Sequence, residues 1–436
     1  MERPSGIDAA LASSWHRQSA QASLERWQEV CQKEKWGETP SDLPLLIAVF
    51  GASWYFTRYI FYRGRTAALL LDHAVVNELR LECFVQKFAA IREMKGPERQ
   101  LELLRLLKNE IMLQILACSL SQRLDQVQTE RALTQLAIAT LLYILEIFGL
   151  HSRSDSRIAV YGMGRIAGEE MTFGSDLDLI FVFENTSPEV NHELLRKVRM
   201  LMRHIAAAGS AGSLYEVDMR LRPHGTSGAL LTPAAAFLEY HLAEREIWER
   251  QMMTRCMPVY DPHGLGRECL DKIMPFVYAE YDREFLRREI AVMRKRVQEE
   301  KGEVSGKFEI KRGPGGIMDI DFLTHYLQLS HGYTCPELRT GSTRAALRLL
   351  AEKQLMAATV VTELLQAYDF LKRIEASVRL FDMKPVSAFS TLTSEHLPVA
   401  AALGYVGDAA PDFAERYKDV TAYVRKQFRE VVGEAS

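Results

Sequence analysis

An apolar strand that carries two carboxylates constrains this chain more than any other feature. The run 177–183 is apolar apart from Asp178, and Asp176 comes directly before it. Aliphatic and aromatic residues of this kind favour a packed, pleated environment. Because side chains alternate across a strand, residues 176 and 178 point to the same side. Two adjacent carboxylates repel each other and lose solvation, so the pair predicts a divalent cation such as Mg²⁺ between them.

A glycine-rich turn lies just before this pair and indicates that the metal carries a phosphate. The turn occupies residues 162–168, with the sequence GMGRIAG, and is expected to enter a short helix. Glycine lets the backbone approach a phosphate closely, and a helix N-terminus attracts anions. A dinucleotide-binding motif is disfavoured, because the third glycine comes one residue late and the acids lie inside the next strand. We therefore expect Gly164, Arg165, Gly174 and Ser175 to contact a nucleotide.

A third strand is expected over residues 214–221, where charged and apolar side chains alternate. Asp218 and Arg220, followed by Arg222, are predicted to share one face. The alternative is a solvated edge strand with an internal ion pair, which is a common and weak interaction. Beside the first pair, Asp218 becomes a third metal ligand and the arginines bind phosphate through their planar guanidinium groups. Three aspartates can hold two Mg²⁺ ions, one at the attacking and one at the leaving oxygen.

A second glycine-rich segment, KRGPGG at residues 311–316, interrupts the helices of the C-terminal half. Its basic residues, Lys311 in particular, are expected to close over the nucleotide. Asp319 and Asp321 follow, but two residues apart on a helix they do not share a face. We interpret them as first-turn acids that favour the helix dipole. Arg255 is assigned either to phosphate or to a structural salt bridge.

Composition is that of a globular protein without a basic excess. The chain has 436 residues, a formal net charge of −3 and 47% hydrophobic residues, which argues against a nucleic-acid partner. The six cysteines form no CxxC pair, so we expect neither a zinc site nor disulfides, and a cytoplasmic location. The longest uncharged apolar stretches, 43–57 and 132–145, are shorter than the ~18 residues of a membrane span, so no membrane partner is expected.

Hydrophobic periodicity divides the chain into three predicted domains. Helical spacing dominates residues 1–153 and 268–436, and an α/β unit occupies 154–267. A polar linker at 151–157 marks the first boundary. In the middle unit we expect strands at 157–161, 177–183, 214–221 and 257–260, and helices at 190–208 and 233–254. The predicted fold is mainly α, with a central α/β domain flanked by helical domains.

Taken together, these segments resemble the glutamine synthetase adenylyltransferase family, within the DNA polymerase β-like nucleotidyltransferase superfamily. The resemblance is carried by GMGRIAGEEMTFGSDLDLIF, LYEVDMRLRPHGTSG, WERQMMTRC and IKRGPGGIMDIDF, in that order. The chain departs from the family pattern at Arg165, Ala167, Thr254 and Asp321, and none of these departures removes a metal ligand. The resemblance implies that the central α/β domain is a polymerase β-like nucleotidyltransferase domain.

The resemblance also implies a reaction. ATP with two Mg²⁺ ions would donate AMP to a tyrosine of glutamine synthetase, or phosphate would remove that AMP as ADP. Asp176, Asp178 and Asp218 would be the catalytic residues and the metal ligands, and a PII-type signalling protein a further partner. Typical members carry two such units, so this chain resembles a single-unit form or a fragment, and the direction stays open. The alternatives are a non-catalytic module that binds nucleotide or a signalling protein, and a nucleotidyltransferase with another acceptor.

Overall fold

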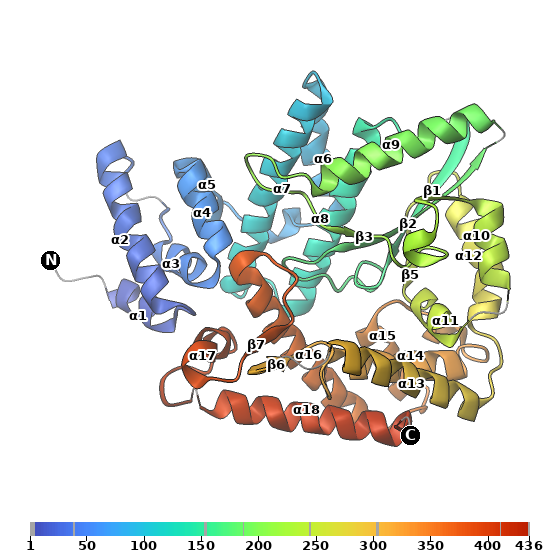
Figure 1. Ribbon diagram of the computed structural model, residues 1–436. Coiled ribbons are helices and arrows are strands. Elements are labelled where there is room, and N and C mark those ends of the chain that lie inside the picture. The colour runs from blue at the N-terminus through green and yellow to red at the C-terminus, as the bar shows by residue number, and fades with distance from the viewer. Residues whose placement is uncertain are drawn as a thin grey trace.

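A small mixed sheet lies between two groups of helices, which make up most of the chain (Figure 1). The computed structural model describes residues 5–37, 40–151, 155–185, 187–243, 246–301, 305–409 and 411–434. This arrangement confirms the prediction of a mainly helical protein with strands in its middle third. Residues 152–154 of the predicted linker lie outside the described residues, and the three domain boundaries remain predictions.

The N-terminal group consists of eight α-helices in the described residues. Short polar side chains mark several of their starts. Asp125 forms a capping box with Gln128 at the start of α8, and the Ser53 hydroxyl accepts from Phe56 N and so separates α3 from α4. The apolar stretch 43–57 is therefore two helices rather than one. The bounds are α1 Ser5–Ser13, α2 Arg17–Glu34, α3 Leu43–Ala52, α4 Trp54–Arg63, α5 Arg65–Asp72, α6 Leu81–Ala89, α7 Pro97–Leu120 and α8 Gln126–Ile147, with 3₁₀ turns η1 Val76–Glu78 and η2 Ala90–Glu93.

The sheet has the strand order β3-β2-β1-β5, and β4 also pairs with β2. Its strands are β1 Ser156–Met163, β2 Leu177–Asn185, β3 Val217–Asp218, β4 Leu231–Pro233 and β5 Cys256–Tyr260. β1 is antiparallel to β2 and to β5, whereas β2 is parallel to β3 and β4. The parallel register places Asp178 directly opposite Asp218. Pairing of β2 with β3 therefore brings together two carboxylates that are distant in the sequence.

The sheet is buried on both faces. Leu177, Leu179 and Phe181 of β2 pack into a core that the N-terminal helices share. Ile180 and Val182 point the other way, into a core built with the C-terminal helices. Because side chains alternate along a strand, Asp178 lies on the side of Ile180 and faces the C-terminal helices.

The structure corrects three expectations for the middle of the chain. The turn after β1 does not enter a helix but continues as turns to residue 169. The third strand covers only Val217–Asp218, because Met219 onward forms a compact turn. The helix expected at 233–254 is two helices, α10 Ala234–Leu242 and α11 Ile247–Met253, and β4 pairs with β2 just before α10. The helix expected at 190–208 is α9 Pro188–Ala206.

The C-terminal group surrounds a small two-stranded sheet that the sequence does not predict. β6 Lys307–Glu309 pairs antiparallel with β7 Ala388–Ser390, about 80 residues later. The helices are α12 Leu265–Val277, α13 Arg283–Lys301, α14 Ile317–His331, α15 Thr343–Glu352, α16 Ala358–Asp382, α17 Thr393–Ala402 and α18 Asp412–Val431, with 3₁₀ turns η4 Pro336–Leu338 and η5 Gly407–Ala409. A further 3₁₀ turn, η3 Gly225–Ser227, lies between β3 and β4. Across the described residues, every helix is too short or too polar to cross a bilayer.

Candidate active site

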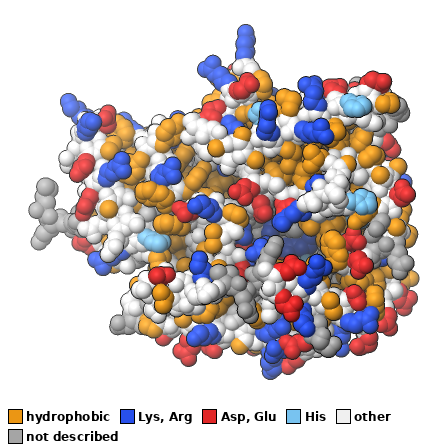
Figure 2. Space-filling model, in the orientation of Figure 1, with side chains coloured by type: hydrophobic (Ala, Val, Ile, Leu, Met, Phe, Trp, Pro, Cys, Tyr) orange, Lys and Arg blue, Asp and Glu red, His pale blue; other side chains and the backbone are white. Residues whose placement is uncertain are grey.

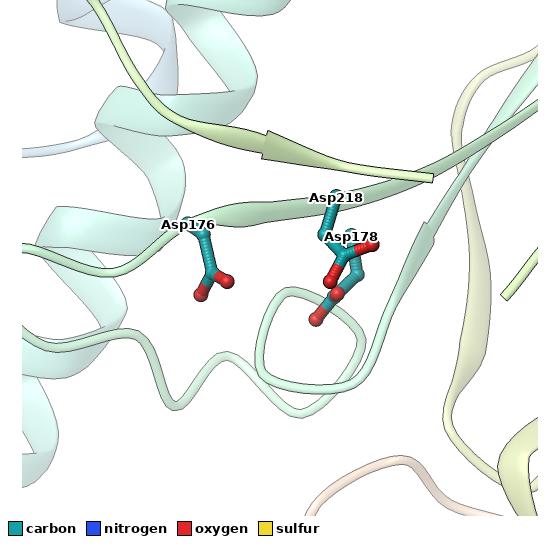
Figure 3. Close-up of side chains that lie close together, drawn as sticks. All are labelled: Asp176, Asp178 and Asp218. Carbon is teal, nitrogen blue, oxygen red and sulfur yellow. The ribbon is translucent and has the colours of Figure 1, made fainter. Parts of the chain in front are cut away.

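Three carboxylates converge on the face of the sheet that looks toward the C-terminal helices. Oxygen atoms of Asp176, Asp178 and Asp218 all lie within 4.8 Å of one another. Figure 3 shows the three side chains pointing into one space, with Asp176 just before β2. In Figure 2, acidic and basic side chains adjoin in a hollow at the centre of the face shown. The predicted cluster is therefore present in the fold.

The electrostatics of the cluster indicate a shortage of positive charge. Burial and the Asp176 carboxylate together raise the pKa of Asp178 to about 7, against the effect of the Lys311 ammonium. Burial also acts on Asp218, but hydrogen bonds from Arg220 outweigh it and lower the pKa of Asp218. Three carboxylates, one of which has its pKa raised to about 7, offer the oxygen ligands and the uncompensated negative charge that suit a hard divalent cation such as Mg²⁺.

Gly164 lies against this cluster, as the sequence predicts. Its φ is +58°, and a Cβ at this position would lie 3.1 Å from Asp178 Oδ2. A side chain here would be strained and would crowd the space between the turn and the carboxylates. The Gly164 N–H donates to the carbonyl of Arg255, so this amide is already used within the fold. The role of Gly164 at the cluster is thus to leave room.

Arg165 does not lie with the carboxylates. Its guanidinium donates to Glu170, to the hydroxyl of Tyr368 and to Asp321, and only 14% of the side chain is exposed. The expected contact with phosphate is replaced by a buried network, because three acceptors from α14, α16 and the same turn already surround the guanidinium. Arg165 therefore anchors the turn to the C-terminal helices.

The two arginines after β3 have different surroundings. Arg220 donates to both carboxylate oxygens of Asp218, with its side chain 66% exposed, and so remains at the edge of the cluster. Arg222 instead donates to the carbonyls of Gly228, Met219 and Thr226. Arg222 does not extend the strand face of Asp218, because the strand ends at 218 and the chain turns back, but it still helps to lower the pKa of Asp218, and its phosphate contact stays a prediction.

Gly174 and Ser175 shape the approach to Asp176. The Ser175 hydroxyl accepts from Thr172 N at 2.9 Å and lies 3.5 Å from the Arg379 guanidinium. Gly174 has a φ of +66°, and a Cβ here would meet the backbone of Met383 at 2.9 Å. Both residues thus hold a tight turn against the end of α16, next to the predicted nucleotide.

Lys311 is the cation that faces the cluster from the C-terminal helices. It is half-buried, and its ammonium makes no hydrogen bond or salt bridge to any of the described residues. Burial lowers its pKa, which the nearby Glu375 opposes and Arg165 and Arg379 reinforce. Its ammonium also acts on Asp178. An ammonium without a partner beside three carboxylates is placed to bind an anionic ligand.

Sequence reasoning missed a buried ring of charges beneath the turn. Arg165 and Arg255 each pair with both Glu170 and Asp321, and the Tyr368 hydroxyl donates to Glu170. Burial would raise the pKa of both acids, but the two guanidiniums outweigh it and lower each pKa to about 2. Of the two assignments open for Arg255, the salt bridge is confirmed.

Of the two acids of α14, Asp319 lies in the first turn, as predicted, and Asp321 does not. Asp321 belongs to the ring, and Asp319 pairs with Arg294 and Arg425 while accepting from Gly315 N. The contact with Gly315 N satisfies an amide just before the helix, but both side chains are buried. The available signal was their position in the run 317–323, whose other residues are all apolar.

The charged network continues along α16. Lys372 pairs with Glu375 and donates to the carbonyl of Glu170, and Arg379 pairs with Glu375. The three α16 residues recur at helical spacing among apolar neighbours, which is the pattern that could have revealed them. These contacts connect the glycine turn at 162–168 and Glu170, through α16, to Ser175.

Comparison with known proteins identifies similar sequences. Residues 43–272 match the model of the glutamate-ammonia ligase adenylyltransferase family, and residues 284–432 match the GlnD PII-uridylyltransferase model. Similar curated proteins are named bifunctional glutamine synthetase adenylyltransferase/adenylyl-removing enzyme. The relative from Chromobacterium violaceum is 34% identical over 59% of this chain and 29% of its own length. Those from Streptomyces avermitilis and Streptomyces coelicolor are 29% and 30% identical, each over 74% of this chain and 33% of their own length. The chain thus spans about a third of the relatives it matches.

Proposed function

Because the chain belongs to the glutamate-ammonia ligase adenylyltransferase family, we propose that it transfers AMP to or from glutamine synthetase. The observation that carries this proposal is the convergence of Asp176, Asp178 and Asp218 within 4.8 Å. The names of the relatives supply the acceptor protein. A chain that only bound nucleotide would have no use for three mutually repelling carboxylates at one point.

The residues of the site divide the work of the proposed reaction. The three aspartates hold the divalent ions, which when bound would neutralise phosphate charge and activate the attacking oxygen. Lys311, whose ammonium acts on Asp178, and Arg220, which donates to Asp218, bind the phosphates of ATP. The acceptor tyrosine hydroxyl attacks the α-phosphorus, and the bond to pyrophosphate breaks. In the opposite reaction, inorganic phosphate attacks the phosphorus of the AMP–tyrosine linkage, the bond from phosphorus to the tyrosine oxygen breaks, and ADP and the free tyrosine hydroxyl are the products.

We propose that the central domain has the polymerase β-like topology. Three features support this. A glycine turn follows β1, two aspartates start β2, and the third aspartate lies on β3, parallel to β2 and in register with it. The helices that pack on both faces of this small sheet explain why it holds its carboxylates rigidly.

We further propose that the C-terminal helices take part in control by a PII-type signalling protein. Residues 284–432 match the PII-uridylyltransferase model, and this segment contributes Asp321 and Tyr368 to the ring that anchors the catalytic turn. A partner that shifts α14 or α16 would therefore shift the turn. The test adds a PII protein, in its modified and in its unmodified form, and measures the rate of AMP transfer. An unchanged rate with both forms would contradict this proposal.

The proposed function is tested by one assay run in both directions. Unmodified glutamine synthetase is incubated with α-labelled ATP and Mg²⁺, and labelled adenylylated glutamine synthetase with inorganic phosphate. Incorporation of label, or its release as ADP, is expected in one of the two and defines the direction. Nucleotide binding without transfer in either direction would instead support the non-catalytic alternative. Transfer to another acceptor, with none to glutamine synthetase, would keep the chemistry and overturn the substrate.

A further inference from the structure

A small cavity lies behind β3, the strand that carries Asp218. It has a volume of about 100 Å³, and its lining includes Tyr55, Lys108, Ser175 and Tyr215. Tyr215 packs into the core shared with the N-terminal helices, whereas Asp178 faces the C-terminal helices. Most of the cavity therefore lies on the other face of the sheet from the aspartates, and it borders the proposed catalytic site at Gly174 and Ser175, which line the cavity and directly precede Asp176.

A buried lysine lies in this cavity without a counter-charge. Lys108 on α7 is 4% exposed, and its ammonium donates to the carbonyls of Ser213 and Leu214 at 3.3 and 2.9 Å. It also lies 5.1 Å from the centre of the Tyr215 ring. Among the described residues no carboxylate lies within salt-bridge distance of it. A buried ammonium without an anionic partner is costly, so such groups are normally paired.

The charges around Lys108 also favour an anion. Burial and the nearby guanidinium of Arg105 on the same helix together lower the pKa of Lys108 to about 7. The acid among the lining residues, Glu216, is exposed to solvent at the mouth of the cavity. A bound anion would restore the positive charge of Lys108 against both effects.

The Tyr215 hydroxyl is the second sign of a missing ligand. The residue is 8% exposed, and its buried hydroxyl makes no hydrogen bond of normal geometry among the described residues, although Thr140 is close enough to lower the pKa of Tyr215 against the effect of burial. Buried hydroxyl groups are nearly always paired, and an unpaired one calls for a ligand or a water. The hydroxyl of Tyr55, by contrast, already donates to Asn109.

We propose that this cavity binds a small oxyanion, inorganic phosphate or a short carboxylate, between the Lys108 ammonium and the Tyr215 hydroxyl. A single water needs roughly 10–15 Å³ of such volume, so about 100 Å³ holds an anion of this size. The anion would fix the backbone at residues 213–215, which leads directly into β3. It would thereby set the position of Asp218 from behind, as a regulatory ligand rather than a substrate.

The test measures anion binding without the proposed reaction. The midpoint of thermal unfolding of the full chain is followed against phosphate, sulfate or acetate at constant ionic strength, with EDTA present and nucleotide absent. The variants are Lys108→Met, Tyr215→Phe and, as an exposed control, Tyr333→Phe. Lys108→Met keeps the volume of the side chain and removes a buried charge, and Tyr215→Phe removes only an unpaired hydroxyl, so both are expected to fold.

The wild type and Tyr333→Phe are expected to show a saturable rise in the midpoint. Lys108→Met should lose the saturable part, and Tyr215→Phe should bind about tenfold more weakly, the usual effect of losing one hydrogen bond to a charged group. A response to phosphate and sulfate but not to acetate would identify a tetrahedral anion, and the reverse a carboxylate. The same concentration dependence in wild type and Lys108→Met, or no saturable response in wild type, would overturn the proposal.

Discussion

Asp321→Asn removes one acid from the buried ring and leaves both arginines short of a partner. Asp321 accepts from Arg165 at 3.1 Å, from Arg255 at 3.3 Å and from the Thr343 hydroxyl at 2.8 Å. Its side chain is only 10% exposed, so water cannot replace the lost charge. The substitution keeps the shape of the residue, and the effect isolates the charge.

Two routes give the size of the loss. The pKa of Asp321 is lowered from 3.8 to about 2, which corresponds to roughly 2–3 kcal/mol of favourable interaction with the ionised form. Removing one partner of a buried ion pair typically costs about 3–5 kcal/mol. We therefore expect the free energy of unfolding to fall by about 3 kcal/mol. At about 2.1 cal/mol/K per residue, the entropy of unfolding of 436 residues is about 0.9 kcal/mol/K, so the midpoint falls by about 3 °C.

The pH dependence has a defined sign. Because the folded-state pKa values of Asp321 and Glu170 are lowered, their stabilisation is present above their unfolded values of 3.8 and 4.5. It is lost as the pH falls through the folded values near 2. The difference between wild type and Asp321→Asn should therefore be full at pH 7 and shrink steadily below pH 4.

The assay is thermal and urea unfolding followed by circular dichroism, with Glu300→Gln as the matched control. Glu300 pairs with Arg296 at the same 3.1 Å, but the two side chains are 56% and 72% exposed. An exposed pair contributes about 0.3–0.5 kcal/mol, so the control should unfold within about 1 °C of wild type. Equal shifts in the two variants, or a shift below about 1 °C in Asp321→Asn, would refute the assignment of Arg165 and Arg255 to a structural ring.

Three further substitutions separate the roles assigned at the site. Lys311→Met should weaken ATP binding about tenfold without lowering the unfolding midpoint, because it removes an unpaired, half-buried cation. Unchanged ATP affinity in equilibrium dialysis would count against a contact between Lys311 and phosphate. Arg222→Met should lower the free energy of unfolding by about 1–3 kcal/mol in urea but leave ATP affinity within about twofold, since its guanidinium holds only backbone carbonyls; a large loss of affinity would restore the sequence-based assignment. Gly164→Ala should weaken Mg²⁺ binding in calorimetry and cost about 1–2 kcal/mol of stability, because φ is +58° and the added Cβ crowds Asp178; wild-type metal affinity would contradict the close approach.

The sequence was most informative where the signal is local. The apolar run of residues 177–183 predicted β2, and the two aspartates at its start predicted one edge of the carboxylate cluster. The alternating segment around Asp218 predicted that this carboxylate would join them, and the three carboxylates do lie together. The strand of Asp218 was overestimated, since the turn that follows places Arg222 on backbone carbonyls, and alternation alone does not show where pairing stops.

The failures concern partners far apart in the chain. Arg165 looked like a phosphate ligand because it follows two glycines, yet its partner Asp321 lies 156 residues later. β6 and β7 pair across about 80 residues with only three residues each, too few to show a strand pattern. Glu170 gave no signal by itself, because a charged residue in a turn is ordinary until tertiary packing buries it. Local periodicity predicts elements and isolated clusters, while buried ion networks depend on how the elements pack.

The central claim is that the three aspartates hold the metal for adenylyl transfer, and Asp178→Asn tests it most directly. The measurement is the rate of AMP transfer with glutamine synthetase, in the active direction, for wild type, Asp178→Asn and the exposed control Asp271→Asn. Asp178→Asn should lose about a thousandfold in rate, equivalent to about 4 kcal/mol of transition-state stabilisation. Its unfolding midpoint in EDTA should equal or exceed that of wild type, because one of three repelling carboxylates is gone. A folded Asp178→Asn protein that transfers AMP at the rate of the Asp271→Asn control would contradict the account.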